Sequence, residues 1–292
     1  MQLKEERENI LKEIVGREKE VTNILATLEA GKHVILEGAP GTTKSTILRT
    51  ITKVRDIPFY LIEGNIDLTP SKLVGHFNPS KVMADDYRVE YFEKGPLTYA
   101  MEGGFLYIEE FNRMPADTAN VLISAIEEGE IQIPRYGAVK ATGDFRVICA
   151  QNPYDDVGTM RVSRAIYDRF CRVKLNYQNL DEELDIVTSQ SDSDDRELID
   201  VAVRVARDTR THNDVKQGAS IRGALDMVAI AEELFKVSSA DRAQVMDDAM
   251  LSAMSGKVWL QETTERPAEE ILREILKKVL AKKEADAKGL SR

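Results

Sequence analysis

Short apolar runs alternate with helical patterns in the first part of the chain. The runs are continuous rather than polar at every second position, which is typical of strands buried on both faces of a parallel sheet. They predict strands at residues 33–36, 58–62, 105–108, 145–150 and 171–175. Between them, apolar residues recur at the spacing of amphipathic helices, at residues 1–30, 44–54, 96–101 and 115–128. Strands that alternate with helices predict an α/β fold: a parallel sheet with helices on both faces.

Two passages depart from this alternation. Residues 63–95 are rich in Pro, Gly and Asn and show no long periodic pattern. Passages of this length inside a compact domain are usually functional or contain small elements of their own. Residues 130–133 and 138–141 alternate between polar and apolar positions around Arg135-Tyr136-Gly137, which predicts a β-hairpin.

The strand signals stop at Asp181. From there, helical patterns are found at residues 181–190, 196–211, 219–235, 240–255 and 267–287. A chain of 292 residues is long enough for two domains. We therefore predict an α/β domain at residues 1–178 and a smaller, all-helical domain at residues 179–292 that includes a C-terminal helix.

Composition and charge narrow the classes of function. The formal net charge of −10 argues against sequence-independent binding of nucleic acid, which needs many Lys and Arg contacts to phosphate. No apolar stretch approaches the roughly 20 residues of a membrane span, so we expect no membrane insertion. A charged N-terminus and only two cysteines, Cys149 and Cys171, favour a cytoplasmic protein with reduced thiols.

A glycine-containing loop follows the first predicted strand and opens a helix. Such a loop wraps its backbone N–H groups around the phosphates of a nucleotide, its Lys reaches the β- and γ-phosphates, and its hydroxyl holds Mg²⁺. The sequence therefore predicts binding of ATP and Mg²⁺. Thr43 stands where the pattern usually has its last glycine. The predicted binding residues are Gly38, Ala39, Pro40, Gly41, Thr42, Thr43, Lys44, Ser45 and Thr46.

Two adjacent carboxylates, Glu109 and Glu110, end the third predicted strand. In open α/β sheets the carboxyl ends of the strands form the binding edge, so both acids are expected beside the phosphate loop. There Glu109, with Ser45, would anchor Mg²⁺, and Glu110 would orient and polarise the attacking water. The pair predicts hydrolysis of ATP to ADP and phosphate.

The order of these motifs resembles that of AAA+ ATPases, and more narrowly of the MoxR family, over residues 15–260. A sheet of the P-loop NTPase type followed by a helical lid domain is the fold that the resemblance implies. The supporting segments are Gly16-Arg17-Glu18, the phosphate loop, Leu68 to Gly75, Gly95-Pro96-Leu97, Phe105 to Arg113, Val147 to Asn152, Asp168-Arg169-Phe170 and Gly218 to Arg222.

The resemblance also implies roles for individual residues. Lys44 belongs to the Walker A motif, and Glu110 is the catalytic acid of Walker B. Asn152 matches sensor 1, although a turn-forming Asn before Pro153 is the alternative. Arg169 matches an arginine finger that reaches a neighbouring subunit; its alternative is an ordinary ion pair with a nearby carboxylate. Arg222 matches sensor 2 of the lid, where the alternative is a helix-surface arginine.

Two residues depart from the family pattern, and two segments correspond to inserts of the family. Glu109 replaces the usual Asp, and Thr43 a glycine; both changes would slow hydrolysis. Residues 63–95 correspond in position to the helix-2 insert, and residues 130–141 to the insert before sensor 1. Contact with the pore or the partner is therefore a hypothesis for Phe77, Arg135 and Tyr136, and contact with a neighbouring subunit for Arg113.

The function implied is a ring-forming, hexameric ATPase that matures or assembles a partner protein, with ATP hydrolysed at subunit interfaces. Proteins of this family are often paired with a protein containing a von Willebrand factor A domain. Two alternatives stay open. One is an AAA+ motor stimulated by nucleic acid; the other is a nucleotide-gated scaffold that hydrolyses little ATP.

Overall fold

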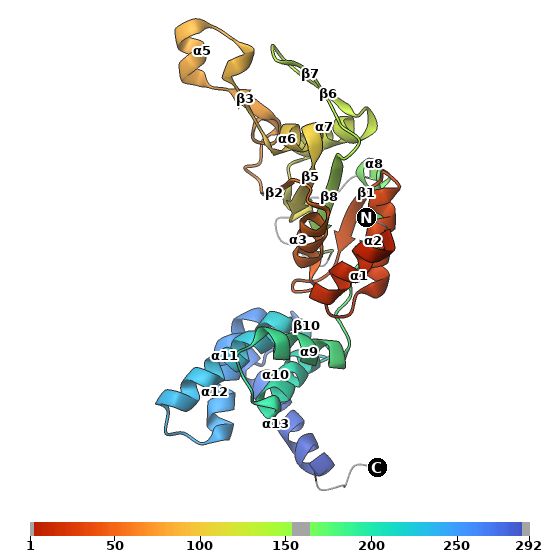
Figure 1. Ribbon diagram of the computed structural model, residues 1–292. Helices are drawn as coiled ribbons and strands as arrows, with labels where there is room; N and C mark the ends of the chain where they lie inside the picture. Colours follow the sequence, from red (N-terminus) through yellow and green to blue (C-terminus); the bar gives the residue numbers. More distant parts are fainter. Residues whose placement is uncertain (1–2, 154–163, 288–292) are drawn as a thin grey trace. The chain divides into compact units, whose positions relative to one another are not determined.

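The fold was determined as a computed structural model, which describes residues 3–153 and 164–287 (Figure 1). The chain divides into two compact units, residues 1–176 and 177–292. The division falls two residues before the boundary predicted from the sequence.

Five parallel strands form the sheet of the first unit. They are β1 (His33–Glu37), β2 (Phe59–Glu63), β5 (Phe105–Glu109), β8 (Arg146–Gln151) and β9 (Phe170–Lys174). Their order across the sheet is β2-β5-β8-β1-β9, and every neighbouring pair is parallel. The predicted α/β fold with a parallel sheet is confirmed, with strand ends displaced by one residue in most cases.

Helices cover both faces of this sheet because successive strand residues point to opposite sides. In β5, Phe105 and Tyr107 pack into one hydrophobic cluster, and Leu106 and Ile108 pack into another. The first cluster contains residues of α1 (Leu3–Glu13), α2 (Glu18–Glu29) and α3 (Lys44–Arg55). The second contains residues of α4 (Pro70–Val74), α6 (Pro96–Gly103) and α7 (Ala116–Glu127).

The passage 63–95 is folded rather than irregular throughout. It contains α4, β3 (Gly75–Phe77), α5 (Pro79–Asp85), a 3-10 turn η1 (Val89–Tyr91) and β4 (Phe92–Lys94). Strands β3 and β4 pair antiparallel, and the predicted hairpin forms from β6 (Glu130–Ile133) and β7 (Gly137–Lys140). Figure 1 shows the β3–α5–β4 segment and the hairpin extending from the same end of the first unit.

Helices build most of the second unit. They are α9 (Leu180–Gln190), α10 (Arg196–Thr209), α11 (Ile221–Val237), α12 (Arg242–Met254) and α13 (Ala268–Ala287), with a 3-10 turn η3 (Ser255–Lys257). The structure adds a feature that the sequence did not predict, an antiparallel pair of β10 (Val215–Gln217) and β11 (Trp259–Leu260). Segments of two or three residues are too short to show a strand period.

Candidate active site

Three strand ends bring most of the predicted site residues to one edge of the sheet. Strands β5, β8 and β1 are adjacent and parallel, with Ile108 beside Cys149 and Glu37 beside Gln151. The chain leaves these strands at Glu110, Asn152 and Gly38, respectively. The phosphate loop, both carboxylates and Asn152 therefore share the carboxyl edge.

The loop between β1 and α3 has an unusual backbone. Gly41 has a φ of 74° and Thr43 a φ of 64°, both in the left-handed region that favours glycine. At Gly38, a Cβ atom would lie 2.4 Å from the carbonyl oxygen of Leu175, so only glycine fits there. Close packing against Leu175 thus explains the glycine at position 38, and the left-handed backbone explains the glycine at position 41. Thr43 adopts the same left-handed conformation although it has a Cβ, and is therefore strained.

The start of α3 carries the donors that a phosphate group requires. The first α-helical hydrogen bond of α3 runs from Ile47 N–H to Thr43 O, and no side chain caps this end. The N–H groups of the preceding residues are therefore directed out of the helix, where the helix dipole also favours an anion. Lys44 Nζ donates to the carbonyl oxygens of Gly38 and Ala39, at 2.8 and 2.9 Å, which keeps the ammonium group on the loop. This donor set fits the phosphates of a nucleotide.

Glu110 is held in a strained backbone conformation directly after the end of β5. Its φ of 51° lies in the left-handed region, and it precedes the 3-10 turn η2 (Phe111–Arg113). Gly64 N–H donates to Glu109 O at 2.7 Å, and a Cβ on Gly64 would lie 2.3 Å from Glu110 O. Arg113 Nε lies 3.1 Å from Glu110 Oε2 as an ion pair without the alignment of a hydrogen bond. Such strain is characteristic of functional sites.

Glu109 ends β5 with its carboxylate beside the Tyr107 side chain. Burial first, and then the Glu109 carboxylate, raise the pKa of Tyr107, so the phenol stays protonated and donates to Glu109. Among residues 3–153 and 164–287, no three His, Cys, Asp or Glu side chains form a group that could hold a metal ion. In phosphoryl-transfer sites, Mg²⁺ is bound through one or two protein ligands together with phosphate oxygens. Ser45 and Glu109 are residues of that chemical type at the shared edge.

Asn152 connects the end of β8 with the segment after Glu110. Asn152 is largely buried, and Asn112 Nδ2 donates to the backbone carbonyl oxygen of Asn152 at 3.3 Å. This hydrogen bond links the η2 turn to the residue predicted to sense the nucleotide.

A buried carboxylate that the sequence analysis did not single out supports the loop. Glu37, the last residue of β1, is 5% exposed. It accepts from Gln151 Nε2 at 2.8 Å and from the Tyr167 hydroxyl at 3.3 Å, and it forms an ion pair with Arg172 Nε at 2.5 Å. The sequence signal for Glu37 was a charged residue at the end of an otherwise apolar strand. The network fixes the end of β1 where the phosphate loop begins.

Arg169 lies at the opposite edge of the sheet from the phosphate loop. It directly precedes β9, whose first residue, Phe170, pairs with His33 at the amino end of β1. The length of a five-residue strand, about 16 Å, therefore separates it from the loop of its own chain. Its guanidinium pairs with Glu127 of α7, as the alternative from the sequence allowed.

Arg222 belongs to the second unit. It is exposed in the first turn of α11, after the N-cap residue Ser220.

The proposed contact residues of the two inserts pack against Tyr87 and Phe92 of the first insert. The Phe77 ring contacts those of Tyr87 and Phe92, and the Tyr136 ring lies 4.3 Å from Phe92, centroid to centroid. The Arg135 guanidinium lies 3.8 Å from the centroid of the Tyr87 ring. In the structure, these side chains therefore anchor the two inserts.

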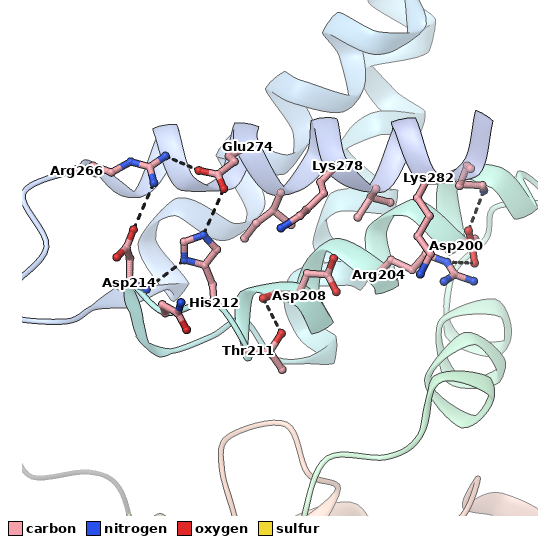
Figure 2. Close-up of a pocket in the computed structure, with 14 residues that line it drawn as sticks. Asp200, Arg204, Asp208, Thr211, His212, Asp214, Arg266, Glu274, Lys278 and Lys282 are labelled. Atoms are coloured by element: carbon pink, nitrogen blue, oxygen red, sulfur yellow. Dashed lines mark hydrogen bonds and ion pairs between the residues drawn. The ribbon is translucent and has the colours of Figure 1, made fainter. Parts of the chain in front are cut away.

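A separate cavity of about 780 Å³ lies in the second unit, between α10 and α13. Figure 2 shows ion pairs at both of its ends. At one end Asp200 pairs with Arg204 and Lys283, each at 2.8 Å; at the other, Glu274 pairs with Arg266 at 2.6 Å. Of these pairs, Asp200–Lys283 joins α10 to α13. None of the predicted site residues lines the cavity.

The parallel sheet, the phosphate loop and the carboxylates at the shared edge define the class of protein as a P-loop nucleoside triphosphatase. Residues 33–170 match the AAA domain (dynein-related subfamily). The gas vesicle ATPase GvpN of Haloferax mediterranei is 30% identical over 256 residues, which cover 81% of this chain and 72% of GvpN. An uncharacterized protein of Staphylococcus aureus is 31% identical over 75% of this chain and 83% of its own length. The chain therefore belongs to the dynein-related subfamily of the AAA ATPases, and its reaction is the hydrolysis of ATP.

Solved structures share the fold at lower sequence identity. A proposed ATPase from Cytophaga hutchinsonii superimposes with a TM-score of 0.55 at 22% identity, over 94% of this chain and 93% of its own. RuvB of Thermotoga maritima superimposes with a TM-score of 0.57 at 18% identity, over 83% of this chain and 71% of its own. In the described part of the chain, no helix is both long and apolar enough to cross a membrane.

Proposed function

We propose that this ATPase is a MoxR-type, hexameric ring that remodels a partner protein and hydrolyses ATP between subunits. The position of Arg169 carries the proposal. Because Arg169 lies beyond the amino end of the sheet, it cannot reach the phosphate loop of its own chain, yet an arginine acting from a neighbouring subunit suits that place. A head-to-tail arrangement of identical chains closes into a ring when the rotation permits.

Each of the proposed site residues has a separate role in ATP hydrolysis. The phosphate loop, residues 38–46, binds the triphosphate, with Lys44 on its terminal phosphates. Ser45 and Glu109 hold Mg²⁺, which would neutralise charge on the phosphate oxygens. Glu110 orients the attacking water and accepts its proton, while Asn152 fixes the position of that water. Arg169 of the next subunit and Arg222 of the lid stabilise the charge that develops in the transition state.

The two inserts are the proposed site of contact with the client. They extend from one end of the first unit, and exposed apolar side chains, Met83 and Val89, lie within residues 63–95. Similarity to the gas vesicle ATPase GvpN supports a chaperone-like role. A protein with a von Willebrand factor A domain is the partner class we propose.

Mixing two inactive variants tests the arrangement of the site. Glu110→Gln and Arg169→Ala should each reduce ATP turnover by roughly two orders of magnitude or more. If the two residues act from different chains, an equal mixture restores activity at about a quarter of the interfaces. Arg164→Ala, an exposed arginine of α8 (Arg164–Tyr167), is the matched control and should retain activity.

The same experiment distinguishes the other possibilities. Turnover per chain should rise with protein concentration as the ring assembles, which sedimentation velocity monitors in parallel. An inactive mixture combined with concentration-independent turnover would refute hydrolysis between subunits. Tight ATP binding without turnover in assembled wild type would identify a nucleotide-gated scaffold. Stimulation by DNA that disappears at high salt would favour a motor on nucleic acid.

A further inference from the structure

Arg17 is a buried cation for which the proposed chemistry has no use. It lies between α1 and α2, is the N-cap residue of α2, and is 5% exposed. A guanidinium is buried to this extent only when its N–H groups are well paired, because loss of hydration is costly. Its partners therefore indicate its role.

The side chain of Arg17 joins the phosphate loop to the last residue of the first unit. Nε donates to Thr43 Oγ1 at 3.2 Å, and an Nη2 hydrogen is directed at Thr42 O at 3.4 Å. The same nitrogen donates to Asn176 O at 2.7 Å, and Nη1 pairs with Glu20 at 3.3 Å. A planar guanidinium with several fixed donors suits this simultaneous contact, which a lysine could not reproduce.

Thr43 is the loop residue that most needs such support. Its left-handed backbone, with a φ of 64°, is costly for a residue with a Cβ and more so for a β-branched one. Its hydroxyl donates to Thr42 O at 2.6 Å and accepts from Arg17 Nε. The hydroxyl thus offers two hydrogen bonds that a glycine at this position would lack.

We propose that Arg17 is a positioning residue for the phosphate loop and that it acts through the Thr43 hydroxyl. The inference rests on the proposed nucleotide site and extends it to a residue outside the loop. Arg17 holds the turn that ends at Thr43, so the N–H groups at the start of α3 face the phosphates before ATP arrives. Preorganisation of this kind lowers the cost of binding. The replacement of glycine by Thr43 is then a functional feature of this chain rather than a defect.

A pair of substitutions at one position isolates the hydroxyl. Thr43→Ser and Thr43→Ala both keep a Cβ in the left-handed conformation, and only the serine keeps the hydroxyl. We expect the dissociation constant of a fluorescent ATP analogue to stay within about twofold of wild type in T43S and to rise about tenfold in T43A. In turnover assays, T43A should raise KM while kcat changes little, because the loop still reaches its bound form.

A double-mutant cycle tests whether Arg17 acts through that hydroxyl. Arg17→Met should weaken binding at least as much as T43A, and the double variant should bind no more than about twofold worse than Arg17→Met alone. Arg55→Met is the control: Arg55 forms a part-buried ion pair with Glu6 at 2.6 Å, away from the loop. It should lower the melting temperature without changing the dissociation constant.

Two results would overturn the inference: equal affinities for T43S and T43A, or fully additive effects of the two substitutions. T43A keeps the test decisive even if Arg17→Met does not fold. Failure of the wild-type protein to bind the analogue would instead refute the proposed nucleotide site.

Discussion

The Arg135 guanidinium lies over the ring of Tyr87, with its central carbon 3.8 Å from the ring centroid. Arg135 belongs to the turn between β6 and β7, whereas Tyr87 follows α5 in the other insert. The Tyr136 and Phe92 rings make a second contact between the same two segments. Two inserts that are far apart in the sequence are thus packed as one projecting arm.

Removing these contacts should loosen the arm without affecting the catalytic edge. A variant with Arg135→Ala and Tyr136→Ala loses a cation–π contact of about 0.5–1 kcal/mol and an aromatic pair worth a similar amount beyond its buried area. We expect faster amide hydrogen exchange in residues 75–94 and basal ATP turnover close to wild type. Remodelling of a client, once one is identified, should be lost.

Tyr99→Ala is the control for that variant. Tyr99 stacks on Tyr60, with ring centroids 5.7 Å apart, outside both inserts. Its loss should leave exchange in residues 75–94 unchanged. If the double variant lost hydrolysis and remodelling equally, the inserts would not act separately from the catalytic edge.

The fold and the catalytic edge could be predicted because their signals are local. Continuous apolar runs indicate buried strands, and the rule that ligands bind at the carboxyl ends of parallel strands places Glu109 and Glu110 beside the loop without any knowledge of contacts. The structure confirms the α/β fold and brings Gly38, Glu110 and Asn152 to the same edge. The roles assigned to these residues stay predictions.

The missed features depend on contacts between distant segments. The role of Arg17 depends on its contact with Asn176, which is far along the chain. The role of Glu37 likewise depends on its contacts with Gln151 and Arg172. A polar residue near an apolar run is an ambiguous signal, since it is more often at the surface. Likewise, the packing of Tyr136 on Phe92 could not be distinguished in sequence from a binding role.

The close approach of Gly64 to the Glu110 backbone makes Gly64 a sensitive position. In Gly64→Ala the new Cβ would lie 2.3 Å from Glu110 O, so the strand end or the Glu110 turn must shift. We expect ATP turnover to fall about tenfold or more, with a stability loss of about 1–3 kcal/mol. Gly143→Ala, where a Cβ meets nothing within 4 Å, is the control and should retain both. Normal turnover in Gly64→Ala would show that the Glu110 backbone tolerates displacement.

His33 should make the first unit less stable in mild acid. Its Nδ1 accepts from Val147 N–H at 2.9 Å, and burial, followed by the positive charges of Arg146 and Lys32, lowers its pKa from 6.5 to about 4. Below pH 6.5 the unfolded chain therefore takes up a proton that the folded chain refuses. The free energy of unfolding should fall as the pH drops from 6.5 towards 4, by about 2 kcal/mol at pH 5.

A substitution separates the contribution of His33 to the pH dependence of stability from the contribution of the Asp and Glu side chains. His33→Asn keeps an acceptor for Val147 N–H but cannot titrate, so its urea denaturation midpoint should change less between pH 7.5 and pH 5 than that of wild type. His76→Asn, at a side chain that is 56% exposed, is the control, and its denaturation midpoint should change between pH 7.5 and pH 5 as much as that of wild type. Identical pH profiles for wild type and His33→Asn would contradict a buried, neutral His33.

Glu183 should control the stability of the second unit. This residue of α9 is 2% exposed and pairs with two cations, Arg207 at 2.7 Å and Arg210 at 2.6 Å. Glu183→Gln keeps the shape but leaves both arginines without their anion, at a cost of about 3 kcal/mol. For a unit of this size, that loss lowers the melting temperature by roughly 10 °C.

The single tryptophan makes this prediction measurable in the whole chain. Trp259 lies in β11 of the second unit, so its fluorescence follows the melting of that unit alone. The transition seen by Trp259 should move down in Glu183→Gln, while circular dichroism should retain a later transition for the first unit. Glu197→Gln, whose partner is exposed Arg242 at 3.3 Å, should melt within about 2 °C of wild type because surface ion pairs contribute little. Equal melting temperatures of Glu183→Gln and Glu197→Gln would show that the ion pairs of Glu183 with Arg207 and Arg210 only offset the cost of burying their charges.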